Sequence, residues 1–269
     1  MPKIAIISEC DNIWALPVWQ KAIPLLQQNG MDIVGIWTCP VKLGGFSGIN
    51  IPKWYFTYFG ALDFVRLGLF SLFSGLRRRF QQYMGNGISN FASLAERYGI
   101  EYHECENPND PKLVTQLKSI QVEILITWVG YILKQQILEA PKTGCINKHA
   151  SILPSYKGLF PYLRAYIANA PQGISFHVMT ETVDGGEILI QQDVPKPIVE
   201  SSMVGFYLYV YQNFSPMLIK AVRNLISGSF SVPQGNSSSS FGLPNHEDIN
   251  RFRKAGGKII RWQDILKAL

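Results

Sequence analysis

The chain has 269 residues, of which 47% are apolar and 16% are charged. This composition supplies enough apolar side chains for a packed core and excludes a generally disordered chain. The length fits one large α/β domain with a small appendage. The net charge of +6 is compatible with an anionic partner but does not specify one.

Cysteine spacing and the first residues narrow the class of protein further. No two cysteines have CxxC spacing, so we expect reduced thiols and no metal site; the four are Cys10, Cys39, Cys105 and Cys145. Residues 1–10 contain no long apolar stretch of the kind that signal peptides carry. We therefore expect a cytoplasmic protein.

The chain opens with a strand–helix–strand pattern. Residues 3–8 form a short apolar run typical of a buried strand, and residues 16–28 have helical spacing and end at Asn29-Gly30. Residues 32–38 are again apolar and β-branched. This order predicts an α/β fold with a mostly parallel sheet flanked by helices.

Similar patterns continue along the rest of the chain. They predict helices at 90–98, 111–119, 160–169 and 203–226, and strands at 101–104, 122–127, 145–149, 173–180 and 187–194. Residues 227–244 are rich in Ser, Gly and Pro and predict a loop, which two short helical patterns follow at 245–269. We therefore divide the chain into an α/β domain at 1–226, with an insertion at 41–88, and a short C-terminal extension at 227–269.

An aromatic segment at 54–80 fits this plan badly. It is interrupted by Asp63 and Arg66 and ends in Arg77-Arg78-Arg79, so its uninterrupted apolar run is short of the roughly 20 residues that a membrane span needs. A helical insertion that buries aromatic side chains against the domain is the favoured interpretation. A dimer contact or a substrate wall, and attachment to an anionic membrane surface, stay open as less favoured interpretations.

The segment 145–191 carries the chemistry. Asn147 and His149 are two residues apart, so in a strand they project from the same side. Asp184 stands before two glycines in a turn between two apolar runs. An amide and an imidazole can stabilise an oxyanion, and an imidazole and a carboxylate can move a proton. These groups suit acyl transfer to an amine, although each residue alone is more often structural.

Three elements in this segment resemble the formyltransferase family that uses 10-formyltetrahydrofolate. They are the stretch from Asn147 to Pro154 (NKHASILP), Tyr156-Lys157-Gly158, and Asp184-Gly185-Gly186. The family includes glycinamide ribonucleotide, methionyl-tRNA and amino-sugar N-formyltransferases. The resemblance implies a Rossmann-like sheet and one-carbon transfer.

The resemblance also implies roles for individual residues. Asn147 would donate its amide to the formyl oxygen, His149 would stabilise the oxyanion, and Asp184 would orient His149 and accept a proton. The folate donor would lie in an apolar cleft between two loops. One loop would supply Tyr131, Ile132 and Leu133, and the other would supply Val183 beside Asp184; Ile132 and Leu133 could equally be core residues.

The acceptor is less clearly indicated. The segment Ser8-Glu9-Cys10-Asp11-Asn12 has no glycine and has two carboxylates, which argues against a bound ribonucleotide phosphate. Only 43 residues (269 − 226) follow Ile226, too few for the C-terminal barrel of methionyl-tRNA formyltransferases. We expect a small-molecule amine, an amino sugar above the other two acceptors. A homodimer is possible, nucleic acid is not favoured, and a membrane partner is not expected. The alternatives are a 10-formyltetrahydrofolate hydrolase and a non-catalytic folate-binding protein.

Overall fold

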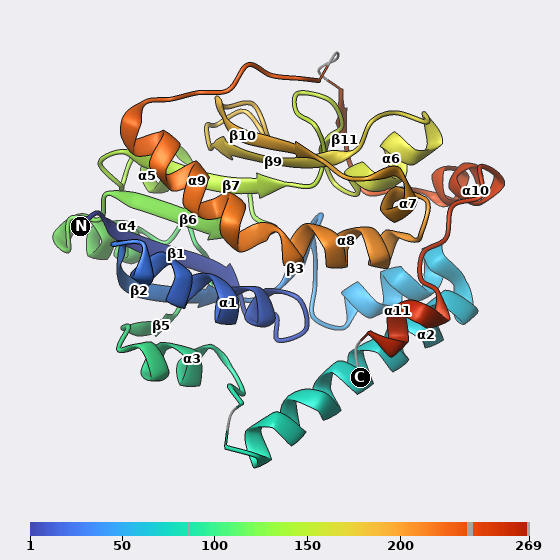
Figure 1. Cartoon of the computed structure of the whole chain (residues 1–269), viewed down its shortest axis with the longest axis horizontal. Helices are drawn as coiled ribbons and strands as arrows, with labels where there is room; N and C mark the ends of the chain where they lie inside the picture. The colour runs from blue at the N-terminus through green and yellow to red at the C-terminus, as the bar shows by residue number, and fades with distance from the viewer. Residues whose placement is uncertain (86, 236–238, 268–269) are drawn as a thin grey trace.

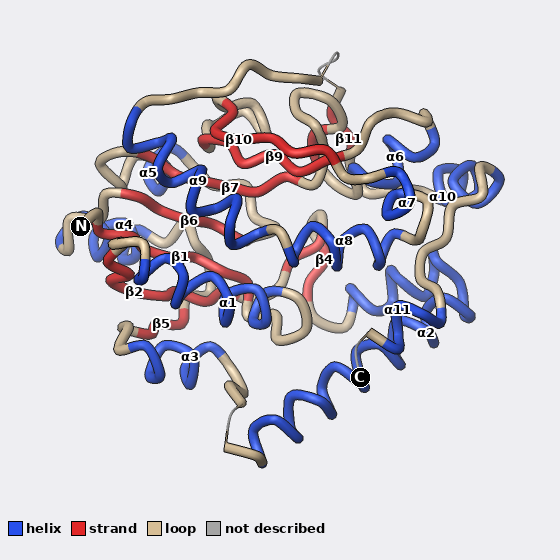
Figure 2. Tube along the Cα trace, viewed as in Figure 1, coloured by secondary structure: helices blue, strands red, loops and turns tan. Residues whose placement is uncertain are grey.

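The computed structural model describes residues 1–85, 87–235 and 239–267, which form an α/β fold around a seven-stranded sheet (Figures 1 and 2). The strand order is β10-β9-β7-β6-β1-β2-β5. These strands are β1 (Lys3–Glu9), β2 (Asp32–Cys39), β5 (Tyr102–Glu104), β6 (Ile124–Trp128), β7 (Gly144–His149), β9 (Gly173–Val178) and β10 (Ile188–Asp193). The five strands from β7 to β5 are parallel, and β9 is antiparallel to both of its neighbours. The predicted mostly parallel α/β sheet is confirmed.

Helices cover both faces of the sheet. The longer helices are α1 (Ala15–Gln28), α2 (Asn50–Tyr83), α3 (Phe91–Tyr98), α4 (Pro111–Ser119), α8 (Met203–Gln212), α9 (Phe214–Ser227) and α10 (His246–Lys254). The shorter ones are α5 (Gln135–Leu138), α6 (Pro161–Ile167), α7 (Lys196–Val199) and α11 (Trp262–Leu266). Two short strand pairs complete the described structure: β3 (Lys42–Leu43) with β4 (Phe46–Ser47), and β8 (Lys157–Gly158) with β11 (Ser240–Phe241).

The central strands are apolar throughout because both of their faces are buried. On β1, Ile4 and Ile6 belong to the large core that includes α1, α3, α8 and α9. Ala5 and Ile7 belong to the smaller core on the other face, together with Leu113 and Leu117 of α4. Alternate side chains of one strand therefore pack against the helices on opposite faces of the sheet. Because β1, β6 and β7 are parallel, their carboxyl ends lie at the same edge.

Two predicted elements differ from the structure. The single helix expected at 203–226 is two helices, because α8 ends where the Asn213 side chain donates to the carbonyl of Tyr209 (2.9 Å). The helical segment expected at 54–80 begins earlier, at Asn50, after the β3–β4 pair at the start of the insertion. Both differences concern how a chain turns between elements rather than which segments are apolar.

Helix α2 corrects the favoured interpretation of the aromatic insertion. It is interrupted at Gly60 (φ 78°, ψ 167°). The part before Gly60 buries Trp54 and Phe59, whereas the part beyond it buries Phe70 alone. Figure 1 shows that this second part runs along the underside of the fold, past α11 and towards α3. The prediction that the insertion buries its aromatic residues therefore holds for Trp54, Phe59 and Phe70, whereas Phe56 and Phe80 are exposed at 52% and 65%.

The C-terminal helices pack against the insertion. Arg253 of α10 forms an ion pair with Asp63 of α2 (2.9 Å), and the Arg66 guanidinium lies over the ring of Trp262 in α11. In the predicted loop at 227–244, residues 236–238 lie outside the described residues, and β11 pairs with β8. The division into a domain at 1–226 and an extension at 227–269 stays a prediction.

Candidate active site

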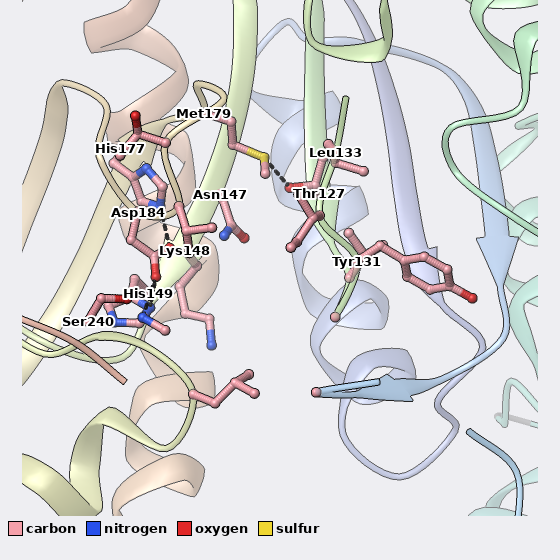
Figure 3. A pocket seen from close by; sticks show the side chains of 18 of the residues that line it. Thr127, Tyr131, Leu133, Asn147, Lys148, His149, His177, Met179, Asp184 and Ser240 are labelled. Atoms are coloured by element: carbon pink, nitrogen blue, oxygen red, sulfur yellow. Dashed lines mark hydrogen bonds and ion pairs between the residues drawn. The ribbon is translucent and has the colours of Figure 1, made fainter. Parts of the chain in front are cut away.

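Strand β7 ends at the candidate site. Asn147 and His149 project from the same side of β7 into one cavity of about 620 Å³, as their spacing predicts (Figure 3). The cavity lies beyond the carboxyl ends of β6 and β7, where parallel sheets commonly bind ligands.

Asp184 approaches His149 from the loop between β9 and β10. Its Oδ2 lies 3.4 Å from His149 Nδ1 and accepts a hydrogen bond from the backbone N–H of Gly158 (2.8 Å). Its Oδ1 lies 3.4 Å from Nε2 of His177 on β9. One carboxylate therefore bridges two imidazoles, and Figure 3 shows the three side chains in a row.

Glycines make this arrangement of backbones possible. Gly158 has φ +88°, and a Cβ there would lie 2.2 Å from the carbonyl oxygen of Phe241. A Cβ on Gly186 would lie 1.8 Å from the carbonyl oxygen of Val178. Asp184 itself is left-handed (φ 48°), a conformation that Asp tolerates better than most residues. Both positions therefore require glycine, because any side chain there would collide with a neighbouring backbone carbonyl.

The surroundings set the charges of the two bridged groups. Burial raises the pKa of Asp184, but the His177 contact, the His149 charge and the Gly158 N–H outweigh it and hold this pKa at about 2. Burial lowers the pKa of His149, reinforced by His177 and Lys148 and opposed by Asp184 and the Tyr156 carbonyl. At neutral pH the site therefore pairs a carboxylate with a neutral imidazole. His149 Nε2 lies 2.8 Å from the Tyr156 carbonyl oxygen, so both ring nitrogens face acceptors, and the neutral ring can donate to only one of them at a time.

Lys148 lies between Asn147 and His149 in sequence, and its side chain takes a different direction. Its Nζ is 4.8 Å from the ring centroid of Trp128 and 5.0 Å from that of Tyr211. Burial lowers the pKa of Lys148 to about 8, although the Asp184 carboxylate acts in the opposite direction. An amine with this pKa is partly neutral near physiological pH and can take up a proton.

The opposite wall of the cavity is the loop after β6. Tyr131, Ile132 and Leu133 line it, and Val183 lines the cavity from the Asp184 loop. Ile132 and Val183 are exposed at 74% and 45%, whereas Leu133 is 4% exposed and also belongs to the smaller core. All seven residues that the sequence singled out therefore border one space.

Glu9 fixes the position of this loop. Its Oε1 accepts the backbone N–H of Lys42 (2.8 Å) and that of Gly130 (2.9 Å). Burial raises its pKa to about 7 against these two hydrogen bonds. A Cβ on Gly130 would lie 2.2 Å from the Lys42 carbonyl oxygen, so the backbones meet closely here. The end of β1 thus holds the loop that faces the Asn147–His149 side.

A second cavity of about 630 Å³ adjoins the first. The two share Lys148, His149, Gly158 and Leu159, and the rest of the second cavity is formed mainly by the start of α1, by α2 and by α8. The site therefore has two chambers that meet at one imidazole. Over the described ranges 1–85, 87–235 and 239–267, no cluster of three His, Cys, Asp or Glu side chains could hold a metal ion.

Comparison with known protein families identifies the segment of the chain that contains the candidate site. Residues 81–203 match the family model described as formyl transferase. This part of the chain belongs to the formyltransferase family. The matched segment contains every predicted site residue, while nearly all of α2 precedes it.

Two sequence relatives of the formyltransferase segment are methionyl-tRNA formyltransferases. The one from Halalkalibacterium halodurans is 35% identical over 173 residues, which is 61% of this chain and 53% of the relative. The one from Synechococcus sp. is 31% identical over 155 residues, 55% of this chain and 47% of the relative. The chain thus spans about half the length of the curated relatives it matches.

Solved structures share the fold over most of the chain. A sugar N-formyltransferase from Shewanella sp. superposes with a TM-score of 0.56 at 17% identity, covering 94% of this chain and 88% of that one. Glycinamide ribonucleotide transformylase 1 from Symbiobacterium toebii gives 0.55 at 14% identity, covering 87% and 92%. At such identities the likeness shows the fold alone, and it confirms the predicted Rossmann-like fold.

Three groups were not assigned to the candidate site from the sequence. His177 was left out because a strand position alone does not say which face is functional. Lys148 was assigned no role from the sequence. Glu9 served only as an argument against a bound phosphate. A period-two reading of β9 against β7 could have found His177, because the two strands place His177 opposite Asn147.

Proposed function

We propose that the protein transfers a formyl group from 10-formyltetrahydrofolate to a primary amine. The observation that carries the proposal is the bridge from Asp184 to His149 on the wall of a cavity that also contains Asn147. The opposite wall, formed by the loop after β6, offers apolar side chains and backbone groups to a flat heterocycle.

The donor assignment has support from a protein of the same fold. An N-formyltransferase from Helicobacter canadensis was solved with folinic acid and dTDP-3-aminofucose; it superposes with a TM-score of 0.54 at 17% identity. The alignment covers 95% of this chain and 80% of that one. By this analogy, Tyr131, Ile132, Leu133 and Val183 would border the folate.

The chemistry assigns one task to each side chain. The acceptor nitrogen attacks the formyl carbon, and the bond from that carbon to the donor nitrogen then breaks. Asn147 donates its amide N–H to the oxyanion that forms, which is worth about 3 kcal/mol in comparable sites. His149, oriented by Asp184, assists the oxyanion and the transfer of a proton to the departing donor nitrogen. The neutral amine of Lys148 takes the proton that the acceptor nitrogen loses, and this proton passes through His149 to the departing donor nitrogen, so that Lys148 and His149 end neutral.

The acceptor we favour is an amino sugar. At the end of β1, Asp11 Oδ1 accepts the backbone N–H groups of Ile13 (2.7 Å) and Trp14 (3.1 Å). A carboxylate thus occupies the amides that a substrate phosphate would use at the start of α1. This supports an acceptor other than glycinamide ribonucleotide. The methionyl-tRNA formyltransferases among the sequence relatives make charged tRNA the second candidate.

The decisive experiment measures tetrahydrofolate release by the purified chain with 10-formyltetrahydrofolate and a panel of amines. The panel contains amino sugars, glycinamide ribonucleotide and charged initiator tRNA. Formylated amino sugar identified by mass spectrometry supports the proposal. Formate release without an amine would instead identify a hydrolase, and tight folate binding without turnover would identify a binding protein.

A further inference from the structure

The second cavity is strongly apolar. Eight aromatic side chains line it, from α2, α8 and the residues that precede α1 and α6: Trp14, Tyr55, Phe59, Phe64, Phe70, Phe160, Tyr207 and Tyr211. The charged side chains on the wall are Asp11 and Lys148, and no arginine is among the described lining residues. A diphosphate would have only Lys148 as a cationic partner here. The cavity instead suits a hydrophobic body whose polar end reaches His149.

Helix α2 also presents an apolar face to solvent. Beyond Gly60, large exposed side chains recur at helical spacing and form a stripe on one side: Leu62, Val65, Leu72, Leu76 and Phe80. Phe64, Leu67 and Phe70, which line the cavity, lie on the other side of the helix. One helix therefore separates an apolar cavity from an apolar outer surface.

The stripe belongs to a helix that lies along the protein. Within the described chain, α2 is long and apolar enough to cross a membrane by length and composition, and only 11% of its most apolar stretch is buried. The Asp63–Arg253 ion pair and the Arg66–Trp262 contact attach it to α10 and α11. These polar contacts favour a helix lying in the membrane surface over one that spans the bilayer.

The charges carried by α2 indicate which kind of surface the exposed apolar stripe would contact. Helix α2 carries five basic residues and one acidic residue: Lys53, Arg66, Arg77, Arg78 and Arg79 against Asp63. Asp63 already pairs with Arg253, and Arg78 donates to the Asn12 carbonyl. A second copy of α2 would bring arginines but no free carboxylate to the stripe. An anionic bilayer supplies both apolar chains and negative charge.

We propose that the acceptor is a primary amine on a hydrophobic carrier, taken from an anionic membrane surface on which α2 lies. The carrier occupies the aromatic cavity, and the amine reaches the carbon that Asn147 and His149 serve. This inference rests on the proposed formyl transfer and specifies the carrier of its acceptor. It differs from the expectation, drawn from the sequence, that no membrane partner is involved.

The carrier is tested with two acceptors that differ only in their tail. The octyl and the methyl glycoside of one amino sugar are compared with 10-formyltetrahydrofolate as donor. We expect a KM at least tenfold lower for the octyl glycoside. Gly68→Leu adds a side chain at a cavity-lining position with open space, so it should raise the KM of the octyl glycoside more than that of the methyl glycoside. Gly75→Leu is the matched control, because Gly75 is on the same helix away from this cavity.

The surface is tested with vesicles of phosphatidylcholine, with and without phosphatidylglycerol. We expect the chain to float with the anionic vesicles at low salt, and Leu72→Glu to reduce the bound fraction at least tenfold. Ile226→Glu is the matched control, since Ile226 is similarly exposed (53% against 54%) but lies on α9.

The outcomes of these experiments distinguish a failure of this inference from a failure of the proposed function on which it rests. Equal KM values for both glycosides, or no vesicle-bound fraction, would overturn the inference while formyl transfer stands. A dimer in solution that Leu72→Glu dissociates, without vesicle binding, would assign the stripe to a second copy and also overturn it. Absence of transfer to any amine would remove the proposed function itself.

Discussion

The two cavities that meet at His149 are built in different ways. The first is formed by strand ends and short loops, where Gly130, Gly158 and Gly186 allow backbones to approach closely. The second is formed by large side chains from helices, above all from α2. The first lies largely within the formyltransferase segment, whereas α2 precedes it almost entirely. In the proposed function, the chemistry and the choice of acceptor therefore have separate structural sources.

The largest expected effect on turnover comes from substitutions in the first cavity. Asn147→Ala, His149→Ala or Asp184→Asn should each lower kcat by about a hundredfold to ten-thousandfold, because each removes an oxyanion or proton-transfer group. Steady-state kinetics with a soluble amine measure this. Asp193→Asn, an exposed carboxylate on β10, is the control and should stay within twofold. Near-normal turnover in any of the three would remove that residue from the mechanism.

A large stability effect is expected in the wall of the second cavity. Phe70 is 4% exposed and stacks on Trp14 with 5.0 Å between ring centroids. Phe70→Ala should lower the free energy of unfolding by about 3 kcal/mol. Phe80→Ala, on the exposed stripe, should change it by less than about 0.5 kcal/mol. Urea denaturation compares the two, and equal values would mean that Phe70 is not packed as described.

A substitution of His177 tests how much its contact with Asp184 contributes to the first cavity. His177→Gln should lower kcat by roughly tenfold, because Asp184 keeps its contacts with Gly158 and His149. The contact with His177 is one of the interactions that hold the pKa of Asp184 at about 2. Its loss should therefore shift the acid limb of the pH profile upward. An unchanged limb with reduced kcat would show a merely structural role.

Lys148 joins the two cavities, and its effect depends on pH. With a pKa of about 8, its neutral form increases as the pH rises through 8. If it takes the acceptor's proton, the rate of the native protein should rise over the same range. Lys148→Met should be several-fold slower and lose that limb. A pH profile that is the same in both proteins would exclude Lys148 as the base.

The same substitution has a predicted effect on stability. Burial lowers the pKa of Lys148 from 10.5 to about 8, so the charged form is less favourable in the folded state. This penalty is full below about pH 8 and disappears as the pH approaches 10.5. Lys148→Met should therefore have a higher Tm than the native protein at pH 7. Thermal unfolding at pH 7 and near pH 10.5 tests whether the difference shrinks.

Much of the formyltransferase fold was predictable because its signals are local. The apolar run of β1, the spacing of α1 and the N-cap residue Asp110 before α4 each act within a few residues. The split of the predicted helix at 203–226 was not predictable, since Asn213 is an ordinary helix residue until its side chain bonds the Tyr209 carbonyl. The exposed face of α2 was missed because a segment dense in aromatic residues is usually buried.

The sequence by itself determined the order of strands and helices, the spacing of Asn147 and His149, and the pairing of Asp184 with two glycines. These features depend on side-chain periodicity and on turn-forming residues, and both are set by residues close together in the chain. Only the tertiary structure decided that Asp184 bridges His149 and His177, that Glu9 fixes the loop at Gly130, and that α2 forms the wall of a second cavity. These relations join segments distant in the chain, and their geometry follows from the packing of whole elements against one another.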